Sequence, residues 1–311
     1  MGKSVTVAVI DSGVRPTHLD LRGQVLNGAD FIAHTGSPVT CDHDQHGHGT
    51  AVSSLIMGHG HSDGNSDGIE GLAPQAKVMP LAIGTGSDSM QEAATAIDFA
   101  VSHGASIINM SFSSPSGTPA MQTAVARAIA HGVVVVAGAG NDSAGRLAWP
   151  AAYPGVVAVG AVDVEGKPWV DSNYGPGLTL TAPGVNIVAA GANSDSEYRV
   201  SDGTSDAAAY VSAEAALVRA EYPGLTAGQV VNRMVKSAVN PTGRVRDDHY
   251  GYGIIRPDAA LTFDIPPGPP GGPLGQGGVA ATGQATPEAA VAVGSAGKVG
   301  QAGGDGVAIA G

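Results

Sequence analysis

The sequence contains one cysteine, Cys41, in 311 residues, so it can form no intramolecular disulfide. Basic residues are also few: 15 Lys and Arg stand against 27 Asp and Glu, which gives a formal net charge of −12. This balance argues against a nucleic-acid-binding surface, because phosphates need clustered cations. No apolar run reaches the about 18 residues of a membrane span, and the first residues lack the basic and apolar regions of a signal peptide. The length fits one large domain or two small ones.

Aromatic residues and charges are missing almost completely from the last part of the chain. Residues 265–311 contain no aromatic residue, and they open with IPPGPPGGP before continuing as a mixture of Gly, Ala and Val. Such a segment buries too little apolar surface to offset the entropy lost on ordering. We therefore expect a folded domain over residues 1–263 and a disordered Pro/Gly/Ala-rich tail over residues 264–311.

The folded part alternates short apolar runs with helical patterns. Four runs are typical of buried strands: residues 5–10, 106–110, 133–137 and 156–162. Apolar residues at helical spacing predict helices over residues 89–103, 118–131, 205–221 and 226–237. Continuous apolar strands that alternate with helices indicate an α/β fold, with a mostly parallel, doubly wound sheet covered by helices on both faces in three layers.

Two polar residues follow or precede these elements at positions suited to chemistry. Asp11 ends the first apolar strand, where parallel sheets gather ligand-binding groups, although it could also cap a turn. His48 lies in CDHDQHGHGT, directly before a helical pattern, and could direct its imidazole into a cleft. A transition-metal site built from Cys41, Asp42 and His46 with other histidines of this region is the alternative, although the spacing matches no regular zinc pattern.

Two further candidates are Ser205 and Asn141. Ser205 stands at the start of a helical pattern, where free N–H groups and the helix dipole favour negative charge, although serine is also a common N-cap. Asn141 follows a Val-rich strand in AGAGND, and could donate to a developing oxyanion. A dinucleotide-binding loop would need a later glycine and a following helix, which are missing here.

These residues occur in the order Asp, His, Asn, Ser, within blocks that together resemble a known family. VAVIDSGV, HGHGTAV, NMSFSSPSG, VAGAGND and DGTSDAAAYVSAEAALV are similar to the signature blocks of the subtilisin-like serine proteases, and YGYGIIRPDAAL resembles their closing segment. The resemblance covers about residues 5–261. The short HGT block and the Gly/Pro tail are similar to the actinobacterial mycosin-like branch.

The resemblance implies a serine endopeptidase with Asp11, His48 and Ser205 as its catalytic triad. It implies that Asn141 and the backbone N–H of Ser205 stabilise the oxyanion, and that residues 84–87 pair with extended substrate. It also places six residues beside the side chain that precedes the cleaved bond: Ser111, Phe112, Ser113, Gly138, Ala139 and Gly140. A transamidase or macrocyclase that uses the same triad, and an inactive fold used for binding, remain the alternatives.

The sequence departs from the family at two positions after Ser205. Asp206 stands where a hydrophobic residue is usual, and Ala209 stands where proline is usual.

The resemblance implies catalysis without a cofactor. Calcium could be bound by Asp63, Asn65 and Asp67, although no bidentate Glu follows them.

The resemblance also bears on partners and location. We expect a monomer that acts on polypeptide substrates and binds no nucleic acid. A secreted or cell-surface location fits the family, and a cytoplasmic one stays open.

Overall fold

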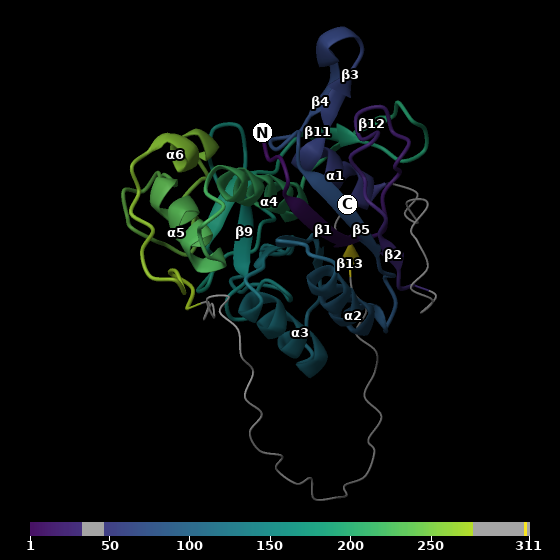
Figure 1. Cartoon of the computed structure of the whole chain (residues 1–311). Coiled ribbons are helices and arrows are strands. Elements are labelled where there is room, and N and C mark those ends of the chain that lie inside the picture. Colours follow the sequence, from purple (N-terminus) through teal and green to yellow (C-terminus); the bar gives the residue numbers. More distant parts are fainter. Residues whose placement is uncertain (33–46, 276–307, 310–311) are drawn as a thin grey trace, which may run out of the picture.

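A seven-stranded parallel sheet forms the centre of the computed structural model, which describes residues 1–32, 47–275 and 308–309 (Figure 1). Its strand order is β10-β9-β8-β6-β1-β5-β2. The strands are β1 (Thr6–Asp11), β2 (Ala29–Asp30), β5 (Lys77–Ala82), β6 (Ile107–Met110), β8 (Val134–Gly138), β9 (Val157–Val162) and β10 (Leu180–Pro183).

The central strands are buried on both faces, as their continuous apolar sequences predict. The four strands expected from sequence correspond to β1, β6, β8 and β9, each within about one residue of its predicted ends, a normal margin for such boundaries. In-register parallel pairing joins β1 to β5 on one side and to β6 on the other. The first strand of the chain therefore lies inside the sheet.

Helices cover both faces of this sheet (Figure 1). One apolar core lies between the sheet and α2 (Ser89–Ser102) and α3 (Pro119–Ala130). The other lies under α1 (His48–Met57), α4 (Thr204–Glu221) and α5 (Ala227–Ser237). This arrangement confirms the three-layer α/β/α fold expected from sequence.

The remaining elements lie around this framework. The helix α2 begins at Ser89, and Asp88 takes the N-cap position. The other elements are β3 (His59–His61), a 3₁₀ turn (Asp63–Asn65), β4 (Asp67–Glu70), β7 (Phe112–Ser113), β11 (Ile187–Ala190), β12 (Tyr198–Ser201), α6 (Pro257–Thr262) and β13 (Ala308–Ile309).

The residues that follow α6 pack against α5. Arg233 donates to the carbonyl oxygens of Phe263 at 2.6 Å and Ile265 at 3.1 Å, and Asn232 donates to those of Pro266 and Pro267. Prolines lack an N–H, but their carbonyl oxygens still accept hydrogen bonds, and side chains of α5 supply the donors. The packed part of the chain thus continues past residue 263 to residue 275, into the segment whose composition predicts disorder.

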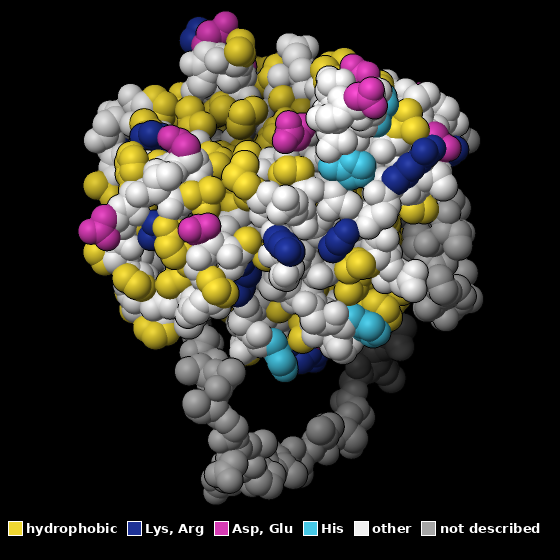
Figure 2. Space-filling view, turned by 45° about the horizontal axis from the view of Figure 1, so that its top comes forward, with side chains coloured by type: hydrophobic (Ala, Val, Ile, Leu, Met, Phe, Trp, Pro, Cys, Tyr) yellow, Lys and Arg dark blue, Asp and Glu magenta, His cyan; other side chains and the backbone are white. Residues whose placement is uncertain are grey.

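No helix among the described residues is long and apolar enough to cross a membrane. On the face drawn in Figure 2, the described Lys and Arg side chains lie scattered among apolar and polar ones. A surface that binds nucleic acid would gather them into a stripe or patch.

Glu214 carries a carboxyl group inside the domain. It lies in α4 and is fully buried, and this burial raises its pKa to about 8. Because the folded state then holds a proton that the unfolded state has lost, stability falls as pH rises from about 4.3, the pKa of a free Glu, toward about 8. The slope is at most about 1.4 kcal/mol per pH unit.

We therefore expect Glu214→Gln to stabilise the fold at pH 9 and to have little effect at pH 4. Urea unfolding at pH 4, 6 and 9 measures this, in a Ser205→Ala background that prevents self-digestion. Glu221→Gln, at an exposed position of the same helix, is the matched control. Equal stabilisation by Glu214→Gln at all three pH values would contradict the prediction.

Candidate active site

The order of the strands marks the carboxyl-terminal edge of the sheet as a place where a ligand can bind. The chain passes from β1 through α1 to β5, and then through α2 to β6 on the other side of β1. Open α/β sheets bind ligands at the carboxyl ends of the strands, at such a reversal of strand order. Asp11 ends β1, Ser111 follows β6, and Gly138 ends β8, so all three lie at this edge.

Asp11 and His48 form a buried hydrogen-bonded pair. The Nδ1 atom of His48 lies 2.8 Å from Oδ1 and 3.0 Å from Oδ2 of Asp11. Asp11 Oδ1 also accepts the backbone N–H of Ser12 at 2.7 Å, which fixes the carboxylate. Since an ionised carboxylate can only accept, the proton of the neutral imidazole belongs on Nδ1, and Nε2 is the nitrogen that can accept one.

A close approach of the backbone sets the position of His48 as the first residue of α1. Gly47, its N-cap, has φ of +68°, and a Cβ there would lie 2.5 Å from the Cβ of Ala192. Glycine is therefore required at this turn.

Opposing influences act on the pKa of His48. Burial lowers it, but the charge of Asp11 and the hydrogen bond to Asp11 raise it, and Asp206 raises it further, while Arg199 acts in the opposite direction. The net result is a pKa above the usual value of 6.5. The imidazole therefore holds its second proton to a higher pH than a free histidine does.

Ser205 is the second residue of α4 and is buried against the end of β6. Its hydroxyl donates to the carbonyl oxygen of Ser111 at 3.2 Å, and the hydroxyl of Ser111 donates back to the carbonyl oxygen of Ser205 at 3.1 Å. The free N–H groups of the first helical turn surround this position and favour negative charge.

Asn141 is held by its side-chain oxygen. Oδ1 accepts the backbone N–H of Thr204 at 3.1 Å and the Thr204 hydroxyl at 2.8 Å. With the oxygen fixed in this way, the amide NH₂ is the part of the side chain that can donate to a ligand. Sequence reasoning did not single out Thr204, because its role depends on the approach of β8 and α4.

A small pocket brings these residues together. Its lining contains Ser205, Asn141, Thr204 and five of the six residues expected to contact substrate: Ser111, Phe112, Ser113, Gly138 and Gly140. Ala139 is the exception, because its side chain is fully buried in the core and its N–H donates to the carbonyl oxygen of Val159. A Cβ at Gly138 would lie 2.8 Å from the Thr204 hydroxyl, so this glycine allows α4 to approach.

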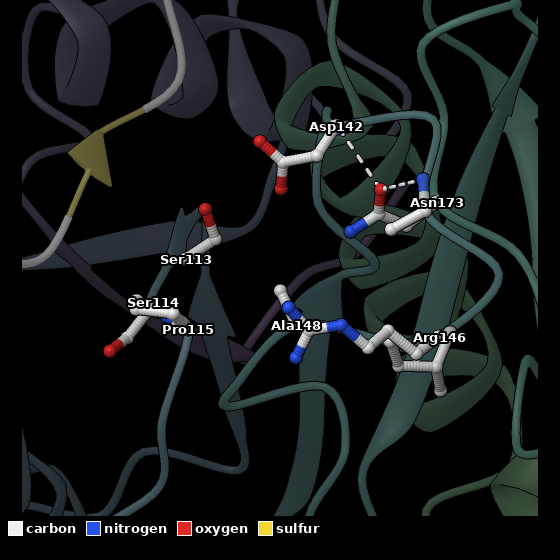
Figure 3. Close-up of a pocket in the computed structure, with 9 residues that line it drawn as sticks. Ser113, Ser114, Pro115, Asp142, Arg146, Ala148 and Asn173 are labelled. Atoms are coloured by element: carbon white, nitrogen blue, oxygen red, sulfur yellow. Dashed lines mark hydrogen bonds between the residues drawn. The ribbon is translucent and has the colours of Figure 1, made fainter.

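A larger pocket of about 430 Å³ adjoins the first one at Ser113 (Figure 3). Ser113 and Ser114 form one side, and Asp142, Arg146 and Ala148 lie across from them. Both a carboxylate and a guanidinium thus face this space, and the Asn173 side chain holds the Asp142 backbone N–H at 3.0 Å. The pocket can receive an extended polar side chain.

Asp206, which stands where the family usually has a hydrophobic residue, is buried and hydrogen-bonded. Asp206 is 4% exposed, and its Oδ2 accepts the hydroxyl of Ser201 in β12 at 2.9 Å. Burial raises the pKa of Asp206, while His48, Ser201 and Arg199 lower it. The carboxyl group thus contacts β12 and still affects the charge of His48.

Only some of the proposed metal ligands lie among the described residues. Cys41, Asp42, His43 and His46 lie outside the described residues. Within the part of the chain that the structure describes, no group of three or more His, Cys, Asp or Glu could hold a metal ion. Asp63 and Asn65 belong to the exposed 3₁₀ turn and Asp67 begins β4.

Comparison with known proteins agrees with this architecture. The model of the subtilase family matches residues 2–253, so the chain belongs to this family of subtilisin-like serine proteases. It is 32% identical to mycosin-1 of Mycobacterium tuberculosis, over 88% of this chain and 72% of that protein, which supports the mycosin-like branch. It is 36% identical to a thermostable alkaline protease of Halalkalibacterium halodurans, over 82% of this chain. The chain spans 66% of that protease, slightly less than two thirds of its length.

Two solved structures of related proteins have folds similar to that of this chain. The crystal structure of MycP1 without its N-terminal propeptide has a TM-score of 0.74 and 30% identity, over 86% of this chain and 94% of that one. Fervidolysin from Fervidobacterium pennivorans, a keratinolytic enzyme related to subtilisin, has a TM-score of 0.77 and 30% identity. This match covers 85% of the chain and 43% of fervidolysin. The expected family and fold are thereby confirmed.

Proposed function

We propose that the protein is a serine endopeptidase that hydrolyses peptide bonds through an acyl-enzyme, with Asp11, His48 and Ser205 as the triad. The observation that supports this most strongly is the convergence at one sheet edge of a buried Asp–His pair and a pocket. That pocket contains a helix-terminal serine and an oriented asparagine amide. The combination supplies a base, a nucleophile and oxyanion donors.

In the first step His48 Nε2 takes the proton of Ser205 Oγ as this oxygen bonds to the substrate carbonyl carbon. The hydroxyl donates to the Ser111 carbonyl in this structure, so rotation about Cα–Cβ of Ser205 must first direct it toward the imidazole. The oxyanion accepts from the Asn141 NH₂ and the Ser205 N–H. The C–N bond then breaks as His48 protonates the leaving amine, and water hydrolyses the ester through the same steps in reverse.

The substrate side of the site follows from the pockets. An extended peptide adds to the edge of β7, and the side chain before the cleaved bond extends past Ser113 into the pocket with Asp142 and Arg146.

Catalysis uses only groups of this chain and requires no cofactor, and a structural calcium ion at Asp63, Asn65 and Asp67 remains a separate hypothesis. We further propose a monomeric, secreted or cell-surface enzyme that binds no nucleic acid, with residues 1–263 as its peptidase domain and the following residues, up to 275, packed against α5.

A fluorophosphonate probe tests the proposal directly. The probe is expected to modify Ser205, as mapped by mass spectrometry, and labelling is expected to disappear in Ser205→Ala. Ser143→Ala, which removes a hydroxyl at an exposed position, is the control and should label like the parent. Labelling that survives Ser205→Ala would refute the assignment of the nucleophile.

A pH profile tests the influence of Asp206 on the base. Because Asp206 helps to raise the pKa of His48, Asp206→Asn is expected to move the acid limb of kcat/KM to lower pH. An asparagine can still accept the Ser201 hydroxyl, so the local packing should persist. Asp202→Asn changes an exposed carboxylate nearby and serves as control. A profile of Asp206→Asn that overlays that of the parent would contradict this prediction.

A further inference from the structure

The C-terminal segment supplies a strand to the candidate active site. β13 pairs antiparallel with β7, with Ala308 opposite Ser113 and Ile309 opposite Phe112. These two strands form a sheet of their own, and Figure 3 shows β13 as the yellow arrow beside the strand that carries Ser113. Two parts of the chain that are far apart in sequence therefore meet at the edge of the pocket.

The direction of β13 matters for its relation to Ser205. From Ala308 to Ile309 the chain moves from Ser113 to Phe112, which is toward Ser111. The carbonyl oxygen of Ser111 accepts the Ser205 hydroxyl, so β13 runs with its carboxyl end toward the nucleophile. The part of a substrate that becomes the acyl group must approach Ser205 in this same direction, because its carbonyl carbon follows its other residues.

We propose that the segment containing Ala308 and Ile309 is an internal ligand of the substrate groove that competes with substrate for the edge of β7. This inference rests on the proposed function for its kinetic consequence, but the pairing itself does not depend on catalysis. Backbone hydrogen bonds at a strand edge give affinity with little demand on side chains. The sequence VAIAG around β13 is uncharged and has small residues beside one isoleucine, which suits such a strand.

The length of the connecting chain permits this occupancy. Residues 276–307 separate β13 from the packed segment that ends at residue 275, and 32 residues can span at most roughly 100 Å. A tethered ligand acts at an effective concentration of about millimolar order, so even a weak two-residue pairing is populated. A short ladder also exchanges readily, and a substrate at high concentration displaces it.

Amide hydrogen exchange tests the pairing without any need for activity. In a Ser205→Ala background, Ala308→Pro combined with Ile309→Pro removes both N–H groups of β13 and is expected to speed exchange in the peptide that covers residues 110–115 several-fold. Ala296→Pro places a proline elsewhere in the same segment and should leave this exchange unchanged. Equal exchange in the double variant and the control would overturn the proposal.

Steady-state kinetics on a short fluorogenic peptide tests the competition in the active chain. The double proline variant is expected to lower the apparent KM by about two- to tenfold, with kcat unchanged. This range corresponds to a parent enzyme in which the C-terminal segment occupies the groove in about half to nine-tenths of the molecules. An unchanged KM would overturn the competitive role, and so would removal of the segment by the enzyme itself, seen by intact mass. A chain that shows the exchange effect but hydrolyses no peptide would contradict the proposed function and not the internal ligand.

Discussion

Ser205→Ala is expected to lower kcat on a peptide substrate by about 10⁶-fold, leaving about 10³–10⁴-fold acceleration over the reaction in water. The large loss follows because the Ser205 hydroxyl supplies the oxygen that forms the ester, whereas the residual rate comes from binding and the oxyanion donors. Kinetic measurement with a sensitive fluorogenic peptide, on protein free of contaminating protease, gives both numbers.

The fold should survive this substitution. Alanine removes the hydrogen bond from the Ser205 hydroxyl to the Ser111 carbonyl, which contributes about 1 kcal/mol. Ser212→Ala is the matched control, because Ser212 lies in the same helix, is buried, and donates to Asn109 at 2.9 Å. Similar thermal stability of the two variants, with activity lost only in Ser205→Ala, is the expected pattern. A Ser205→Ala enzyme within tenfold of the parent would exclude Ser205 as the nucleophile.

Much of the fold could be predicted from sequence because its central strands are continuous apolar runs. β1, β6, β8 and β9 are buried on both faces, and such runs are recognisable without knowledge of their partners. β11 and β12 were not predicted, since each is only four residues long and they are defined by their antiparallel pairing with one another. The packing of residues 264–275 was also missed, because its stabilising donors are side chains of α5.

The candidate site also has features that could be predicted from sequence and features that could not. Asp11, His48, Asn141 and Ser205 could be proposed because the blocks that contain them, taken together and in order, resemble those of the family. Their roles stay predictions until the variants are measured. Ala139 shows what local sequence cannot supply: it lies between two glycines that line the pocket, yet its side chain points into the core. Ala139 follows the last residue of β8, and the hydrogen bond from its N–H to the carbonyl oxygen of Val159 in β9 depends on the pairing of strands that are distant in sequence.

The second large effect concerns Asn141. Asn141→Leu is expected to reduce kcat by about 10²–10³-fold, the usual loss for one oxyanion donor, with little change in KM. The reason is that the amide NH₂ interacts with charge that develops only in the transition state. Full kinetic curves that separate kcat from KM provide the measurement. A rise in KM with unchanged kcat would instead indicate a role in ground-state binding.

A second variant separates the two roles of Asn141, hydrogen-bond donation by its NH₂ group and the holding of Thr204 by its Oδ1 atom. Leucine also removes the acceptor for the Thr204 N–H and hydroxyl, so it could displace the start of α4 and with it Ser205. Asn141→Asp keeps an oxygen at this position and the side-chain shape, but replaces the NH₂ donor by a carboxylate oxygen. If the donor is what matters, Asn141→Asp should lose at least as much kcat as Asn141→Leu while retaining the parent's thermal stability. If Asn141→Asp retains most of kcat, the side chain acts by holding Thr204, and the oxyanion is stabilised by other groups.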